Sequence, residues 1–109
     1  MNVLFIRKHK RFAVRRMVAI SSDEVLRRGL LVEASLDGLR IGNLDTDGLT
    51  IGSTVELRIH GYGTLAAELR WTQPGVAGLR LLRALHIAEL NELIRLCRTG
   101  SDDLLAYGT

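Results

Sequence analysis

Apolar and polar side chains alternate along most of the chain between Phe12 and Leu81. The alternation is clearest in two neighbouring stretches, where alternate positions are held by Val55, Leu57 and Ile59 and then by Leu65, Ala67, Leu69 and Trp71. A period of two places successive side chains on opposite faces of a β-strand. The segment Gly61-Tyr62-Gly63 between the stretches offers the positive φ values of a tight hairpin. We therefore expect two antiparallel strands, each with one buried face.

Shorter apolar runs predict four more strands. The residues that share a face in these runs are Phe12, Val14, Val18 and Ile20; Leu30, Val32 and Ala34; Leu39 and Ile41; and Leu79 and Leu81. Arg16 interrupts the first run, and turns at Asp37-Gly38 and Gln73-Pro74-Gly75 precede the last two. Six short strands at regular spacing favour a closed or nearly closed antiparallel barrel, which leaves no exposed strand edge.

Beyond the last predicted strand, the apolar period lengthens to that of an α-helix. From about Leu85 to Arg98 the apolar positions include Ile87, Leu90, Ile94 and Cys97. This pattern predicts one amphipathic helix, and Gly100 is placed to end it. The fold class is therefore mainly β: a six-stranded antiparallel β-barrel with a C-terminal α-helix. We expect a flexible basic arm over residues 1–11, the barrel and its helix over 12–98, and a tail over 99–109.

The composition is that of one ordered domain. The chain has 109 residues, of which 47% are hydrophobic and 25% are charged, as is typical of globular proteins. Its one cysteine, Cys97, lies on the apolar side of the predicted helix and can form no intrachain disulfide, which fits a reducing cytoplasm. No stretch reaches the roughly 18 apolar residues of a membrane span. We expect a cytoplasmic protein without membrane insertion.

Charge is distributed unevenly along the chain. The net charge is +3, but residues 1–28 hold eight Lys and Arg against two acidic residues, whereas the remainder holds seven Arg against ten acidic residues. Such asymmetry predicts that an anionic partner meets the N-terminal segment. A solvated basic arm that only aids solubility is equally consistent with the charge pattern.

Two short motifs flank the first two predicted strands. Arg7 and Arg11 stand four residues apart before the first strand, and the run Glu33-Ala-Ser35-Leu-Asp-Gly38 lies at the bend after the second. Residues four apart point to the same side of a helix or a strand, so the two guanidinium groups could converge on one ligand. The planar fork of arginine donates paired hydrogen bonds to a phosphate or to the edge of a guanine. Carboxylate and hydroxyl oxygens at the bend could bond the same ligand.

Together these motifs resemble the PilZ family of cyclic di-GMP receptors, whose pattern is RxxxR followed by (D/N)xSxxG on a six-stranded barrel. The resemblance covers roughly residues 7–98 and extends to Trp71 and to the run Gly75–Leu81. It implies that the ligand-binding residues are Arg7, Arg11, Glu33, Ser35 and Gly38. Glu33 departs from the family pattern, because its carboxylate lies one methylene further from the backbone than that of the usual Asp.

We therefore predict a bacterial receptor or adaptor domain that binds cyclic di-GMP and needs no cofactor. In this hypothesis the arm before Phe12 orders on binding and alters the surface shown to an unidentified effector protein. The main alternative, favoured by Glu33, is a degenerate PilZ-like interaction domain that does not bind cyclic di-GMP. A third interpretation is a small barrel that binds nucleic acid through its basic arm. The aromatic content of 5% argues against it, because single-strand binders stack bases on exposed rings.

Catalysis and metal binding find little support in the sequence. The three histidines are dispersed along the chain, and Ser35 lacks the G-x-S-x-G setting of a nucleophile. Residues 45–48 begin like a calcium loop, but Thr50 stands where that loop requires glycine. We expect a binding protein and not an enzyme.

Overall fold

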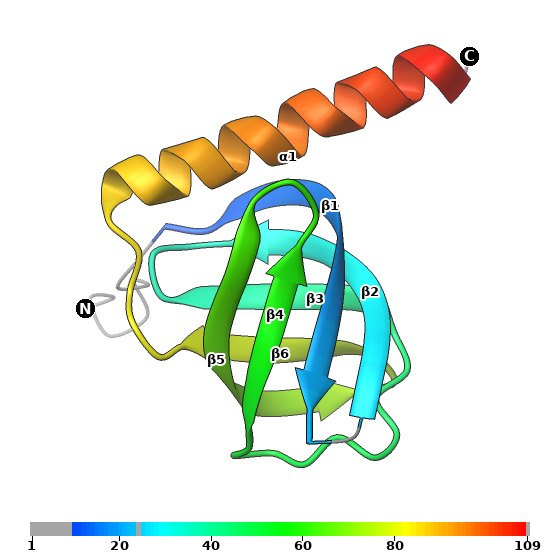
Figure 1. Ribbon diagram of the computed structural model, residues 1–109, viewed down its shortest axis with the longest axis vertical. Coiled ribbons are helices and arrows are strands. Elements are labelled where there is room, and N and C mark those ends of the chain that lie inside the picture. Colours follow the sequence, from blue (N-terminus) through cyan, green and yellow to red (C-terminus); the bar gives the residue numbers. More distant parts are fainter. Residues whose placement is uncertain (1–9, 24, 109) are drawn as a thin grey trace, which may run out of the picture.

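The computed structural model describes residues 10–23 and 25–108, with side chains as far as Arg98. Within these residues, six strands form one closed barrel in the order β1-β2-β3-β6-β5-β4, and every neighbouring pair is antiparallel (Figure 1). The elements are β1 (Phe12–Ser22), β2 (Val25–Ala34), β3 (Gly38–Leu44), β4 (Thr54–Ile59), β5 (Gly63–Gln73), β6 (Gly75–Leu81) and α1 (Ile87–Gly108). The predicted fold class is confirmed.

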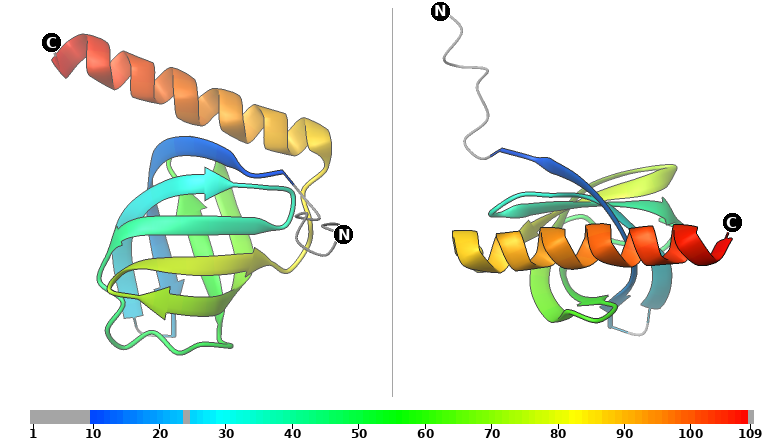
Figure 2. Two further views of the ribbon diagram at one scale, coloured as in Figure 1. Left: turned by 180° about the vertical axis from the view of Figure 1, so that it is seen from behind. Right: turned by 90° about the horizontal axis from the view of Figure 1, so that it is seen from above.

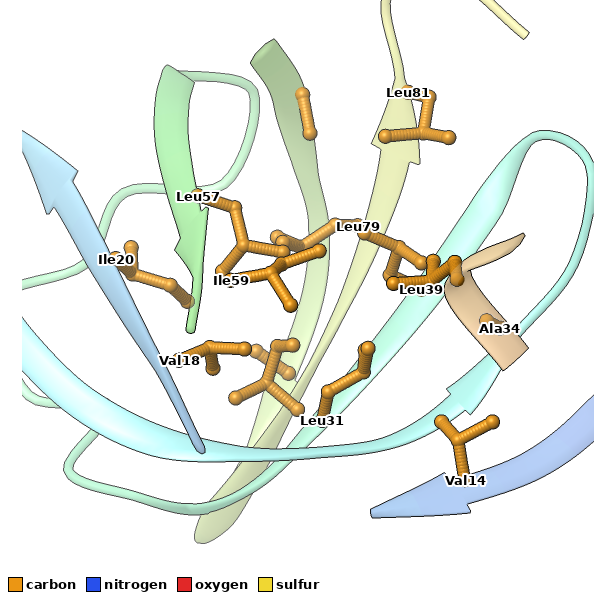
Figure 3. Packing of buried hydrophobic residues seen from close by; sticks show 14 of the residues in the cluster. Val14, Val18, Ile20, Leu31, Ala34, Leu39, Leu57, Ile59, Leu79 and Leu81 are labelled. Atoms are coloured by element: carbon orange, nitrogen blue, oxygen red, sulfur yellow. The ribbon is translucent and has the colours of Figure 1, made fainter. Parts of the chain in front are cut away.

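Apolar side chains from all six strands fill the barrel interior. Figure 3 shows several of them, including Ile20, Leu31 and Leu57, pointing toward one another between the strands. Val55, Leu57 and Ile59 are each at most 2% exposed, so the predicted alternation in β4 is confirmed. Burying one such aliphatic side chain contributes about 1.5–3 kcal/mol to stability.

The hairpin between β4 and β5 turns on two glycines, as predicted. Gly61 and Gly63 have φ angles of 81° and 137°, in the region that favours glycine. Arg16 of β1 donates from Nε to the carbonyl oxygen of His60 in this hairpin, at 2.7 Å. Between Ala13 and Arg16, β1 carries one more residue than β2. Arg16 thus lies at the end of a β-bulge, and its polar group is satisfied by the hairpin that it contacts.

The predicted buried face of β2 is wrong in part. The sequence places Leu30 and Val32 on that face, whereas both are only half-buried. Leu31 is fully buried instead, together with Ala34. Between Leu31 and Glu33, β2 carries one more residue than β3. The extra residue shifts the period of two by one position, so side chains on either side of the bulge follow different alternations.

A cap fixes the start of α1. The backbone N–H of His86 donates to Oε1 of Glu89 at 2.8 Å, and this hydrogen bond lowers the pKa of that carboxyl. Leu85 and Leu90 are both buried on either side of the cap, an arrangement that sets the angle at which the chain enters a helix. The helix begins at Ile87, two residues after the predicted start.

The helix α1 lies across one end of the barrel (Figures 1 and 2). Its buried side chains belong to the same core as those of the strands, and they are Leu90, Leu93, Ile94 and Cys97. Burial raises the pKa of the Cys97 thiol, and the side chain fills the core as predicted. In the described part of the chain, no helix combines the length and the apolar character needed to cross a bilayer.

The predictions for the two chain ends have different outcomes. The sequence predicts that the helix ends at Gly100, which is wrong, because α1 continues through this position to Gly108. A glycine within a helix costs about 1 kcal/mol relative to alanine and does not by itself end the helix. Most of the predicted tail is therefore helical backbone. The predicted arm, with Arg7, lies outside the described residues except for its last two positions.

We expect Leu93→Ala to destabilise the protein by about 2–5 kcal/mol, because Leu93 is 0% exposed in the core shared by α1 and the barrel. Urea denaturation followed by circular dichroism measures this change. Asn91→Ala is the matched control, since Asn91 is exposed on the same helix, and it should alter stability by less than about 0.5 kcal/mol. Equal effects of the two substitutions would contradict the packing of α1 on the barrel.

Candidate functional site

A pocket of about 370 Å³ lies where the turn between β2 and β3 meets β5 and β6. Arg11, just before β1, completes its lining. The strands that line the pocket are neighbours in the barrel, so residues distant in sequence meet there. In the rear view of Figure 2, this turn lies beside the segment that leads from β6 to α1.

Ser35 organises the turn between β2 and β3. Its backbone N–H donates to the carbonyl oxygen of Gly38 at 2.9 Å, and its Oγ accepts from the N–H of Gly38 at 3.0 Å. Among the described residues, Ser35 is the one polar residue that is buried, with 5% exposure. Its hydroxyl satisfies a backbone donor that would otherwise be unpaired. The serine of the second motif therefore has a structural role in the turn.

Gly38 is not required by the conformation of the bend. Its φ is not positive. A Cβ at this position would make ordinary contacts of 3.5 Å with the carbonyl oxygen of Leu79 and with Oγ of Ser35. What the glycine provides is space, because it lines the pocket without a side chain.

Glu33 reaches the pocket because of the bulge in β2. Without the extra residue it would follow the alternation of Leu31, which is buried inside the barrel. Instead Oε1 of Glu33 lies 3.2 Å from Nη1 of Arg11, and the side chains are 28% and 44% exposed. An exposed ion pair of this kind contributes about 0–1 kcal/mol. The pair can therefore be exchanged for a stronger contact at little cost.

Trp71 also reaches the pocket after a bulge. The sequence pattern places it on the same face as Leu69, which is wrong, because β5 carries one more residue than β6 between these two positions. The indole is 36% exposed and lines the pocket, whereas Leu69 is fully buried. One feature of the sequence could have pointed to Trp71 as a pocket residue. Trp71 follows a cation, Arg70, at the end of an alternating run.

Two further guanidinium groups line the pocket, those of Arg40 and Arg70. Neither residue belongs to the two sequence motifs. Arg70 pairs with Glu68 at 3.0 Å. The guanidinium of Arg40 lies 5.6 Å from the ring centroid of Trp71, and its Nε is buried without a hydrogen-bond partner. Guanidinium groups beside an indole suit a ligand that combines anionic groups with planar rings.

Of the five residues predicted to bind ligand, the structure brings four into one pocket: Arg11, Glu33, Ser35 and Gly38. The fifth, Arg7, lies outside the described residues. Their role in binding stays a prediction. The described part of the chain contains no group of three His, Cys, Asp or Glu residues that could hold a metal ion.

Comparison with known proteins gives a family and a fold. The family model of the PilZ domain matches residues 5–99. The structure is similar to that of the Bacillus subtilis inhibitor of motility MotI/DgrA, with a TM-score of 0.57 and 19% sequence identity, covering 84% of this chain and 48% of that protein. The chain thus spans about half the length of that protein, and the likeness concerns the fold. A search of curated proteins gives no match.

We expect Ser35→Ala to lower the free energy of unfolding by about 1–3 kcal/mol, because the N–H of Gly38 loses its acceptor in a buried turn. Thermal and urea denaturation measure the change. Ser35→Thr, which keeps a hydroxyl, should recover part of the loss. The matched control is Ser53→Ala, whose Oγ bonds the carbonyl oxygen of Thr50 in an exposed loop. If Ser35→Ala were no more destabilising than this control, the hydroxyl would have no structural role.

Proposed function

Because this chain belongs to the PilZ domain family, we propose that it is a bacterial receptor domain that binds cyclic di-GMP in the pocket beside the turn between β2 and β3. PilZ domains are binding and adaptor domains. The observation that carries the proposal is the convergence of the two motifs. Arg11 from the first motif bonds Glu33 from the second across 22 positions of sequence. Ser35 and Gly38 line the same pocket.

The chemistry of cyclic di-GMP matches the side chains that line the pocket. The ligand carries two phosphates and two guanines, and a guanidinium group donates paired hydrogen bonds to either. The carboxylates of Glu33 and Asp37 offer acceptors for the N–H groups of a guanine. The indole of Trp71 offers a ring on which a base can stack, a contact worth about 1–3 kcal/mol per base.

Glu33 is both a candidate ligand contact and a competitor of the ligand. Its carboxylate already accepts a hydrogen bond from Arg11, the guanidinium that would bind a phosphate. This exposed pair is worth about 0–1 kcal/mol, whereas a charge-assisted bond to a ligand is worth about 1.5–3 kcal/mol, so the exchange favours binding. If the Arg11–Glu33 pair were instead stronger than the bond from Arg11 to the ligand, the chain would be a degenerate interaction domain. That is the second candidate function, and this ion pair is the observation in its favour.

Hydrogen bonds connect the pocket to the helix that would present a signal. The carbonyl oxygens of Leu36 and Asp37 in the turn accept from the N–H groups of Leu85 and Leu81, at 2.7 and 2.8 Å. Leu85 packs beside the cap at the start of α1. A ligand that shifts the turn would therefore act on the segment that enters the helix. We propose that this change, with ordering of the arm that carries Arg7, alters the surface offered to an effector protein.

Isothermal titration calorimetry with cyclic di-GMP tests the receptor function. We expect the wild type to bind and Arg11→Ala to weaken binding about 10- to 150-fold, the equivalent of about 1.5–3 kcal/mol for one charge-assisted contact. Arg58→Ala is the matched control, because Arg58 is an exposed arginine of β4 that does not line the pocket. The control should bind like the wild type. Absence of binding by the folded wild type would refute the receptor, and equal losses in both variants would indicate diffuse attraction only.

Glu33→Asp separates the receptor from the degenerate domain. We expect this variant to bind cyclic di-GMP at least as tightly as the wild type, because it keeps the carboxylate but withdraws it from Arg11. Binding by the variant alone would identify the wild type as a degenerate interaction domain. The same titrations with a random oligonucleotide at low and high salt test the nucleic-acid interpretation, since such binding weakens steeply with salt.

A further inference from the structure

Three residues on neighbouring strands form one row across the pocket. Gly78 of β6 pairs in register with Arg40 of β3 on one side and with Trp71 of β5 on the other. All three line the pocket. The strand β6 lies between β3 and β5. The side chain of Trp71 therefore extends toward Arg40 if it passes over Gly78.

The indole of Trp71 lies directly over Gly78. A Cβ at Gly78 would overlap Nε1 and Cε2 of the indole and would come within 2.8 Å of its Cδ1. These are the three nearest atoms, and all belong to this one ring. The φ of Gly78 is not positive. Glycine is therefore required at this position by the ring that covers it and not by the backbone conformation.

Arg40 stands at the far end of the same row. The 5.6 Å between its guanidinium carbon and the ring centroid of Trp71 is within the range of cation–π attraction. Arg11 and Arg70 each pair with a carboxylate, whereas the charged group of Arg40 contacts the ring. The indole is therefore constrained by Gly78, which it covers, and by the guanidinium of Arg40, which lies over the ring.

We propose that Gly78 and Arg40 are positioning residues that hold the indole of Trp71 flat across β6, as a preformed stacking surface for a purine base. That the base is a guanine of cyclic di-GMP rests on the proposed function. The way in which Gly78 and Arg40 hold the indole does not depend on that function. A ring that is already fixed loses less conformational entropy when a base stacks on it. Gly78 and Arg40 would thus favour a ligand with planar bases over one that offers phosphate alone.

The ring can be followed without any ligand, because Trp71 is the one tryptophan of the chain. Gly78→Ala should displace the indole, which increases acrylamide quenching of its fluorescence and weakens its near-ultraviolet circular dichroism. It should also lower the equilibrium constant for folding about 10- to 100-fold, as expected for overpacking. Gly42→Ala is the matched control, because a Cβ there would make ordinary contacts of 3.5 Å with Val32 and 4.0 Å with Leu30. The control should leave the tryptophan signals unchanged.

A double-mutant cycle identifies the ring as the cause. With Trp71→Ala as the background, Gly78→Ala should change the folding equilibrium by less than about threefold, since the overlapping atoms are gone. A cost equal to that in the wild type would overturn the proposal, because another group would then exclude the side chain. Unchanged quenching of Trp71 in Gly78→Ala would overturn it as well.

Arg40 is tested by charge, with variants that leave Gly78 unchanged and so do not depend on the folding of Gly78→Ala. Arg40→Gln removes the cation and should increase the quenching of Trp71, whereas Arg40→Lys should restore part of the protection. Equal quenching in the wild type and Arg40→Gln would exclude Arg40 as a positioning residue.

Titration with cyclic di-GMP then tests the stacking role separately. If the wild type binds, Gly78→Ala should bind about 5- to 150-fold more weakly, the range for losing one stacked base. Unchanged affinity would refute stacking on this ring. Absence of binding by the wild type would refute the proposed receptor, while the ligand-free signals would still decide how the indole is held.

Discussion

Two strands carry one extra residue at the point where they reach the pocket, between Leu31 and Glu33 in β2 and between Leu69 and Trp71 in β5. In both strands the residue before the bulge is fully buried in the core, and the residue after it lines the pocket. Because side chains in a strand alternate with a period of two, one extra residue is the smallest change that moves a side chain to the other face. The barrel thereby keeps a closed core. Two residues after a buried leucine, β2 directs the carboxylate of Glu33 outward and β5 directs the indole of Trp71 outward.

The barrel could be predicted because its determinants are local. Alternating side chains such as those around Leu57 and glycines at tight turns mark strands and hairpins within a few residues. A bulge has no such signature, since Val32 and Arg70 continue the alternation in sequence and only the partner strand reveals the extra residue. That is why the faces of Leu30 and Trp71 were predicted wrongly. The motif residues of the pocket were recognisable by spacing, whereas its other members come from strands that only the fold brings together.

The guanidinium groups of the pocket are balanced by groups of the same chain. Arg11 and Arg70 each pair with a glutamate, and Arg40 lies against an aromatic ring. These partners allow several cations to line one pocket without strong mutual repulsion. Under the proposed function, a ligand anion would therefore exchange one ion pair for another, and its net gain would be smaller than the sum of its new contacts. Selectivity would then depend on the two features of the proposed ligand that carboxylates lack, its planar bases and the fixed spacing of their hydrogen-bonding edges.

The hydrogen bonds of Ser35 would allow the proposed ligand contact without loss of the turn. A hydroxyl accepts two hydrogen bonds and donates one. Its acceptor side holds the N–H of Gly38 at 3.0 Å, whereas its donor side has only long contacts, 3.3 Å to the carbonyl oxygen of Gly38 and 3.4 Å to Oδ1 of Asp37. Such O–H···O distances exceed the usual range of about 2.5–3.0 Å, so the hydroxyl proton can turn toward a ligand oxygen without breaking the bond that shapes the turn. The turn would then move as a unit, and its carbonyl oxygens, which bond Leu81 and Leu85, would carry the displacement to the start of α1.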